Sequence, residues 1–238
     1  MSEEALPEID FQQSITTMFG TPFVSVDWPN TEDMDQQIYD LVVAEEQADD
    51  QGRGIRSNAG GWQSRGNLLM RPEPAIVRLK QMMETTVFEL LGALVRKESG
   101  ERTFTLLFDS WANVCRNGNY NVVHSHPNAM WSIVYYVSSG EPDPSISYSG
   151  LLELLDPREA TSYIQVANTV LDARMFITNR PGRMVVFPSW MKHMVHPFVG
   201  SGTRISIACN VNVMEEVRTN RPQDFEVAKA AGGSPPKP

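Results

Sequence analysis

Histidine occurs four times in this 238-residue sequence, and only in two short segments. His124 and His126 flank a single serine, while His193 and His196 lie in a later segment, FPSWMKHMVHPF. In an extended chain, residues two apart project from the same face, so His124 and His126 can reach one ion. Imidazole suits iron, zinc, copper or nickel, whereas calcium and magnesium prefer oxygen ligands. The pattern predicts a transition-metal site with His124, His126 and His193 as ligands.

Two further residues could bind a ligand beside this metal. Arg204 and Ser206 follow on the next predicted strand and project from one face, because they are two residues apart. The planar guanidinium of arginine matches a carboxylate through two parallel hydrogen bonds. We expect Arg204 and Ser206 to hold one end of a dicarboxylate whose other end chelates the metal. His196, three positions after His193, should face the other way and either serve in packing or support the metal ligands from outside the site.

The elements that must position these side chains are, in sequence order, two predicted helices followed by a series of predicted strands. Helical spacing of apolar residues predicts helices over 30–47 and 74–97, the second opened by a proline. Over 100–214 the sequence changes to short apolar runs separated by Gly, Pro, Asn or Ser, which is typical of strands. The predicted fold is mainly β with flanking helices. It is a double-stranded β-helix, meaning a jelly roll or cupin-like barrel, with two N-terminal α-helices packed on one sheet. Such a barrel brings distant strands, and so both histidine segments, together.

Length and composition favour one domain. A chain of 238 residues with 41% hydrophobic composition can bury one substantial core. We expect a single domain over 1–218, with a helical and loop part at 1–100 and the barrel at 101–218. Residues 219–238 are polar and rich in Pro and Gly, so a flexible tail is predicted there.

The segment before the barrel is a candidate for the substrate entrance. SNAGGWQS combines glycines with an aromatic ring and an amide, and loops on a rigid scaffold often carry specificity. Trp62 and Gln63 are therefore predicted to contact substrate, together with Trp131 on the pocket wall. The alternative for Trp62 is that it fills the space between the helices and the sheet.

Charge and cysteine content restrict the partners. The formal net charge of -9 argues against nucleic acid, since binding a phosphate backbone requires clustered Lys and Arg. Two cysteines are too few for a disulfide framework, which indicates a reducing compartment. The acidic N-terminus does not resemble a signal peptide, and no apolar run approaches the ~20 residues of a membrane span. We expect a cytoplasmic protein acting on a small molecule, amino acid or peptide, with a homodimer favoured by exposed sheet edges.

Several segments between Phe19 and Val213, taken in order, resemble the iron(II)/2-oxoglutarate-dependent oxygenases, in a bacterial and phage branch related to the prolyl-hydroxylase-like group. The resemblance implies iron(II) as metal, 2-oxoglutarate as cosubstrate, and a hydroxylase that releases succinate and CO2. It also implies that His124 and His193 bind iron, and that Arg204 with Ser206 binds the far carboxylate of 2-oxoglutarate. Asn113, Asn121, Tyr135 and Asn210 would line the cosubstrate pocket. The segments that carry the resemblance are SNAGGWQS, SWANVCRNGNYNVVHSHPNAMWSIVYYV, GLLELLDPR, FPSWMKH and RISIACNV.

The sequence departs from the superfamily pattern at one ligand. That pattern is His-x-Asp or His-x-Glu followed by a distant His, and His126 stands at the carboxylate position. Either His126 binds the metal, which we favour, or Glu153 or Asp156 supplies a carboxylate, or water or an anion takes the place. Two other functions stay open. One is a cupin-type three-histidine dioxygenase that does not use 2-oxoglutarate, and the other is a non-catalytic metal-binding barrel.

Overall fold

The computed structural model describes residues 19–49, 57–94, 102–158 and 174–217. The predicted tail, 219–238, lies outside the described residues, and the single domain over 1–218 stays a prediction. The elements in chain order are β1 (Val24–Asp27), α2 (Glu32–Ala48), β2 (Asn58–Ala59), β3 (Trp62–Gln63), the 3-10 turn η1 (Leu68–Met70), α3 (Pro74–Leu94), β4 (Arg102–Cys115), β5 (Tyr120–His124), β6 (Trp131–Pro142), β7 (Leu152–Leu155), β8 (Arg174–Ile177), β9 (Arg183–Pro188), β10 (His193–Val195) and β11 (Gly200–Val217).

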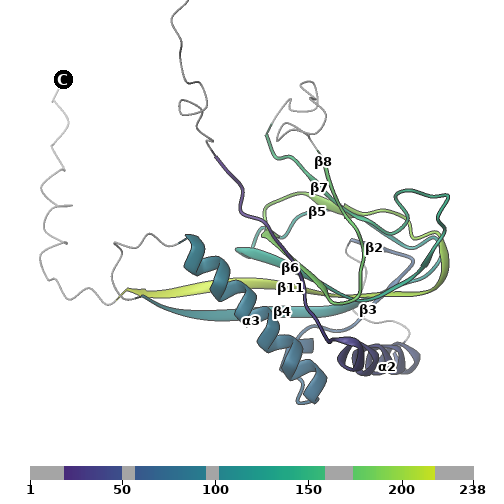
Figure 1. Ribbon diagram of the computed structural model, residues 1–238, viewed down its shortest axis with the longest axis horizontal. Helices are drawn as coiled ribbons and strands as arrows, with labels where there is room; N and C mark the ends of the chain where they lie inside the picture. The colour runs from purple at the N-terminus through teal and green to yellow at the C-terminus, as the bar shows by residue number, and fades with distance from the viewer. Residues whose placement is uncertain (1–18, 50–56, 95–101, 159–173, 218–238) are drawn as a thin grey trace, which may run out of the picture.

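The strands form two antiparallel sheets that face each other (Figure 1). The larger sheet has the order β1-β9-β6-β11-β4-β3, and the smaller has the order β2-β5-β10-β7-β8. Apart from the pairs β3–β4 and β7–β8, neighbouring strands in the two sheets are not consecutive in the sequence, which is typical of a jelly roll. The predicted fold class, mainly β with a double-stranded β-helix, is confirmed.

Both helices pack on the outer face of the larger sheet (Figure 1). Ile38 of α2 and the stripe containing Ile76, Leu79 and Met83 of α3 are fully buried against it. Pro74 is the first residue of α3, a position where its missing N–H costs no helical hydrogen bond. Among the described residues, no helix is both long and apolar enough to cross a membrane.

The larger sheet separates two apolar regions, because side chains alternate along its strands. On β6, Ile133, Tyr135 and Val137 join the core under the helices, which we call the helix-side core. Tyr136 points the other way and packs with residues of the smaller sheet, inside the barrel. The barrel interior is therefore where the predicted site residues can meet.

Candidate metal centre

The structure brings His124, His126 and His193 together. His124 ends β5 and His193 begins β10, and the two are directly opposite each other in the antiparallel pairing of these strands. One ligand nitrogen from each of the three rings lies within 4.8 Å of the other two. The ring centroids of His124 and His193 are 4.2 Å apart, and that of His126 lies 5.0 Å and 5.2 Å from them. Three imidazoles thus converge at one end of the smaller sheet.

Two of these rings are oriented by backbone carbonyls. Nδ1 of His124 lies 2.7 Å from the carbonyl oxygen of Val122, and Nδ1 of His193 lies 2.9 Å from that of Met191. A carbonyl only accepts, so each Nδ1 carries the proton and each Nε2 keeps a lone pair for a metal. Burial lowers the pKa of His193 to about 3 and also lowers the pKa of His124. Both rings are therefore neutral at physiological pH, which is the form that binds metals.

The third ring is held between the two histidine segments. The backbone N–H of His126 donates to the carbonyl of Ser189 at 2.8 Å, which ties the loop after β5 to the segment before β10. Its ring centroid lies 5.8 Å from that of Trp111. This backbone bond fixes the position of His126 in the centre.

Glu153 and Asp156, the less favoured carboxylate alternatives to His126, instead contact other partners away from this centre. Glu153 lies 2.6 Å from Nε2 of His196 and 3.3 Å from Nε of Arg174, while Asp156 pairs with Arg158. Within the described part of the chain, the three histidines form the one cluster of His, Cys, Asp or Glu suited to a metal. His196 faces away from the centre, as expected.

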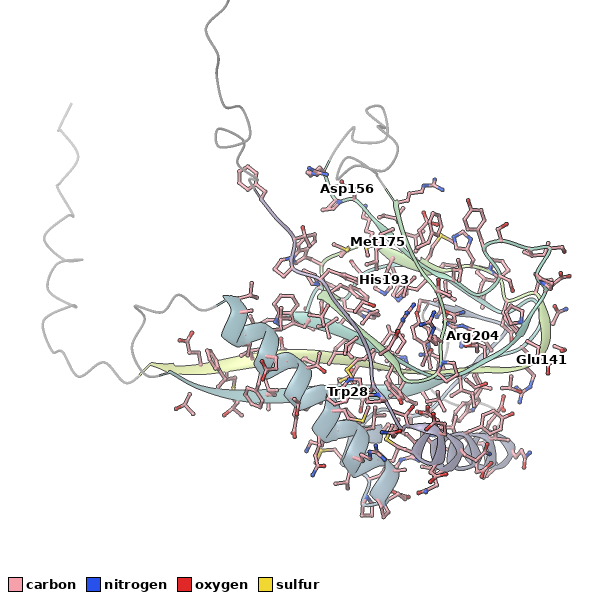
Figure 2. The ribbon with its side chains drawn as sticks, viewed as in Figure 1. Trp28, Glu141, Asp156, Met175, His193 and Arg204 are labelled. Carbon is pink, nitrogen blue, oxygen red and sulfur yellow. The ribbon has the colours of Figure 1, made fainter. Side chains whose placement is uncertain are left out.

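Arg204 is buried and lines the same cavity as the three histidines; Figure 2 labels it inside the barrel together with His193. Its side chain is 1% exposed and lies over the ring of Tyr136, with the guanidinium carbon 5.5 Å from the centroid. Nη1 lies 3.5 Å from Oγ of Ser206, and Nε has no hydrogen-bond partner among the described residues. No carboxylate of those residues forms an ion pair with Arg204, so its buried charge lacks a counter-ion in the described part of the chain.

Tyr136 adds a second unpaired donor to this region. Its side chain is fully buried, and its hydroxyl has no hydrogen-bond partner in the part of the chain that is described. Burial raises the pKa of Tyr136 to about 12, so the hydroxyl keeps its proton. A buried cation with one unpaired donor of its own, beside an unpaired hydroxyl, fits a carboxylate, which supplies a negative charge and several acceptor sites. The residues present therefore fit the dicarboxylate 2-oxoglutarate.

A narrow cavity connects the histidines with Arg204. The three asparagines predicted for its wall, Asn113, Asn121 and Asn210, all line it, as does Gln63. Nε2 of Gln63 donates to Oδ1 of Asn113 at 2.7 Å, so the short strand β3 is tied to the pocket wall.

Three predicted site residues lie elsewhere. Tyr135 points to the helix side of the larger sheet, where its hydroxyl donates to Oδ1 of Asp35 at 2.7 Å. Trp62 and Trp131 are each 7% exposed in the helix-side core, and Nε1 of Trp62 donates to the carbonyl of Asp49. The predicted roles of these three residues in the pocket are wrong, because the strands that carry them place their rings under the helices. Tyr136, next to Tyr135, is the pocket residue that the sequence reasoning missed.

A wider cleft of about 650 Å³ adjoins the metal centre on its open side. It shares His124, His126, Trp111, Gln63 and Asn210 with the narrow cavity. The two spaces therefore meet at the histidines, as a cosubstrate pocket and a substrate cleft would.

The family model described as "Putative 2OG-Fe(II) oxygenase" matches residues 109–210, which contain all three histidines and Arg204. No protein of curated function matches the sequence.

Solved structures support the fold. A prolyl-4-hydroxylase from Pseudomonas putida superposes with a TM-score of 0.56 at 16% identity, over 81% of this chain and 92% of that chain. A non-heme alpha ketoglutarate dependent carbocyclase, SnoK from nogalamycin biosynthesis, gives 0.56 at 14% identity, over 92% and 90%. A prolyl hydroxylase from Trichoplax adhaerens, in complex with a peptide fragment of the hypoxia inducible factor oxygen degradation domain, gives 0.53 at 16% identity, over 80% and 83%. At these identities the similarity shows the fold.

The family match supports the cofactors, which similarity of fold alone does not. It covers the strands that hold the three histidines and Arg204, and this superfamily uses iron(II) and 2-oxoglutarate. The predicted superfamily and cofactors are confirmed at this level. Residues 109–210, which hold the candidate metal centre, match the family described as "Putative 2OG-Fe(II) oxygenase", and the fold is similar to that of solved oxygenases that use iron(II) and 2-oxoglutarate.

Proposed function

We propose that the protein is a dioxygenase that hydroxylates a small molecule, amino acid or peptide. In the overall reaction, substrate C–H, 2-oxoglutarate and O2 give the alcohol, succinate and CO2. The observation that carries this proposal is Arg204, a buried guanidinium with no counter-ion among the described residues, in the same cavity as three converging histidines. Iron(II) with 2-oxoglutarate supplies the oxidising power to functionalise an unactivated C–H bond.

The protein's own residues bind, orient and exclude water. His124 and His193 would hold the metal through Nε2, because Nδ1 of each donates to a backbone carbonyl, and His126 would hold it through one of its ring nitrogens. Arg204 and Tyr136 would bind the far carboxylate of 2-oxoglutarate, with Ser206 beside them. The apolar interior around Tyr136 keeps bulk water away from the cosubstrate.

A site of three neutral imidazoles carries one negative charge less than one with two histidines and a carboxylate. We therefore expect His126→Asp to retain iron(II) more tightly than the natural protein, and His126→Ala to retain it less tightly. Metal affinity measured by competition with a chelator checks both expectations. Equal affinity in all three proteins would remove His126 from the ligand set.

The direct test is cosubstrate turnover. Purified protein with iron(II), ascorbate and 2-oxoglutarate should form succinate, and His193→Ala should abolish this activity. His196→Gln is the matched control, because His196 lies outside the cavity and contacts Glu153 instead. Metal-dependent succinate formation that survives in His193→Ala would contradict the proposal.

The same assay separates the other two functions. A cupin-type dioxygenase gives Arg204 no role, so oxygen consumption that is independent of 2-oxoglutarate and unchanged in Arg204→Met would favour it. A non-catalytic barrel would bind metal and consume no oxygen. The buried Arg204, whose Nε has no hydrogen-bond partner among the described residues, favours the 2-oxoglutarate-dependent enzyme over both.

A further inference from the structure

Gly150, a residue without a side chain, lies directly beside Arg204. Its backbone has a φ of +63°. A Cβ atom at this position would lie 3.2 Å from Cδ of Arg204, 3.1 Å from Cδ2 of Phe198 and 3.2 Å from Nδ2 of Asn179. Carbon atoms in contact are ordinarily about 3.5–4.0 Å apart. The three neighbouring side chains therefore occupy the space that a side chain at position 150 would need.

The narrow cavity lies on the other side of Arg204. Arg204 lines this cavity together with the three histidines, whereas Gly150, Phe198 and Asn179 are not part of its lining. Gly150 thus lies outside the cavity, in contact with the residue that closes the end away from the histidines. The place of this end depends on how far back the side chain of Arg204 can stand.

Two of the three neighbours of Gly150 have little room to move. Phe198 is fully buried, and its ring also packs against Gly140, where a Cβ atom would lie only 2.7 Å from Cζ. Nδ2 of Asn179 donates to the carbonyl of Gly150 itself at 2.6 Å. Arg204, by contrast, has a long side chain that borders the cavity. A side chain at position 150 would therefore displace Arg204, and would move it toward the histidines.

We propose, on the basis of the function proposed above, that Gly150 is a positioning residue that sets the length of the cosubstrate. Because Gly150 has no side chain, Arg204 stands back far enough to bind the far carboxylate of a five-carbon 2-oxo diacid whose other end reaches the metal. A four-carbon diacid is too short to reach both. A six-carbon diacid is too long, because Phe198 and Asn179 leave Arg204 no room to move further back.

Binding of three 2-oxo diacids of increasing length tests this inference without turnover. The protein is loaded with Mn(II), and calorimetry measures its affinity for freshly dissolved oxaloacetate, for 2-oxoglutarate and for 2-oxoadipate, which have four, five and six carbons. One methylene group more or less changes the affinity of a fitted pocket by roughly 10- to 200-fold. We therefore expect the natural protein to bind 2-oxoglutarate at least about tenfold more tightly than either of the other two.

A matched pair of glycine variants assigns this preference to Gly150. Gly150→Ala should lower the ratio of 2-oxoglutarate affinity to oxaloacetate affinity at least about fivefold, because the guanidinium moves toward the metal. Gly118→Ala is the control, since Gly118 has a φ of +86° and no atom lies within 4 Å of the added Cβ atom. Alanine is strained at both positions, but only at position 150 does it meet Arg204. The control should keep the natural ratio.

A third variant makes the opposite change. Phe198→Leu opens space beside Gly150 and lets Arg204 stand further back. The preference for 2-oxoglutarate over 2-oxoadipate should then fall at least about threefold. Urea denaturation of each variant shows whether it is folded.

The outcomes separate this inference from the proposed function. If 2-oxoglutarate binds in a Mn(II)-dependent manner but no more tightly than the other two diacids, the inference is overturned and the proposed function stands. Equal ratios in Gly150→Ala and Gly118→Ala also overturn the inference alone. If Gly150→Ala does not fold, Phe198→Leu decides, because an unchanged preference against 2-oxoadipate in that variant overturns the inference. Absence of Mn(II)-dependent binding of all three diacids overturns both proposals.

Discussion

Tyr135 and Tyr136 are neighbours on β6, and both are fully buried, yet they lie in opposite regions of the molecule. On the helix side, the hydroxyl of Tyr135 donates to Asp35, which also accepts from Thr31 at 2.8 Å. Inside the barrel, the hydroxyl of Tyr136 has no partner among the described residues, and neither has Nε of Arg204. The same strand thus carries a completed hydrogen-bond network on one face and an incomplete one on the other.

The difference distinguishes structural from functional polar groups. Buried polar groups are normally paired, because an unpaired one costs about 1–3 kcal/mol. The network of Asp35, Tyr135 and Thr31 is closed and anchors α2 to the larger sheet. Among the described residues, the hydroxyl of Tyr136 and Nε of Arg204 have no partner, and we expect a ligand to supply the missing acceptors. Substitutions on the two faces should therefore affect different measurements.

The largest expected effect comes from Arg204→Met. It should weaken 2-oxoglutarate binding by about 2–5 kcal/mol, or roughly 30-fold and more, because the ligand's carboxylate loses its cation. Without 2-oxoglutarate the free energy of unfolding should be unchanged or higher, since an uncompensated buried charge is removed. Calorimetry and urea denaturation measure the two quantities, with Arg180→Met as the exposed control. A destabilised variant with normal 2-oxoglutarate affinity would show that Arg204 is structural.

The second largest effect is expected for Tyr136→Phe. Losing a hydrogen bond to a charged ligand should weaken 2-oxoglutarate binding by about 1.5–3 kcal/mol. Because the hydroxyl has no partner among the described residues, stability without 2-oxoglutarate should not fall. Titration with 2-oxoglutarate and urea denaturation check these expectations. Unchanged affinity would exclude Tyr136 from the cosubstrate pocket.

Tyr135→Phe should give the reverse result. It removes one of the two donors to the buried Asp35 and should lower the free energy of unfolding by about 1–3 kcal/mol. The affinity for 2-oxoglutarate should stay at the natural value, since the side chain lies under the helices. Urea denaturation of Tyr135→Phe and Tyr136→Phe, which form a matched pair, compares their free energies of unfolding. Loss of 2-oxoglutarate affinity in Tyr135→Phe would contradict the separation of the two faces.

The smallest expected effect is a pH dependence on the helix side. Burial raises the pKa of Asp35 above its ordinary value of 3.8, so the folded state binds a proton more strongly than the unfolded state. The contribution of Asp35 to stability is then fully present below pH 3.8 and decreases as pH rises through the raised pKa. Its slope cannot exceed about 1.4 kcal/mol per pH unit for one proton. Urea denaturation of Asp35→Asn beside the natural protein at several pH values measures this contribution, and a difference that does not change with pH would contradict it.

Much of the fold and the site could be predicted from the sequence because the signals were local. The helical spacing of apolar residues indicated both helices. The short apolar runs separated by Gly, Pro, Asn or Ser indicated a barrel. His124 and His193 were recognisable because the four histidines gather in two segments, and Arg204 because of its position after the second one. The predictions for Trp62, Trp131 and Tyr135 were wrong because they assigned each side chain to the wrong face of its strand. A nearly continuous apolar run such as WSIVYYV, buried on both faces, carries no alternation from which to read that face.

The sequence by itself determined which residue types were available for chemistry and which elements would carry them, because composition and periodicity are properties of short segments. The tertiary structure alone decided that His193 lies opposite His124, that Glu153 is committed to His196 and Arg174, and that Tyr136 rather than Tyr135 enters the cavity. The physical reason is that strand register and sheet packing depend on contacts between residues far apart in the chain. A shift of one residue in register would turn every side chain of a strand to the other face.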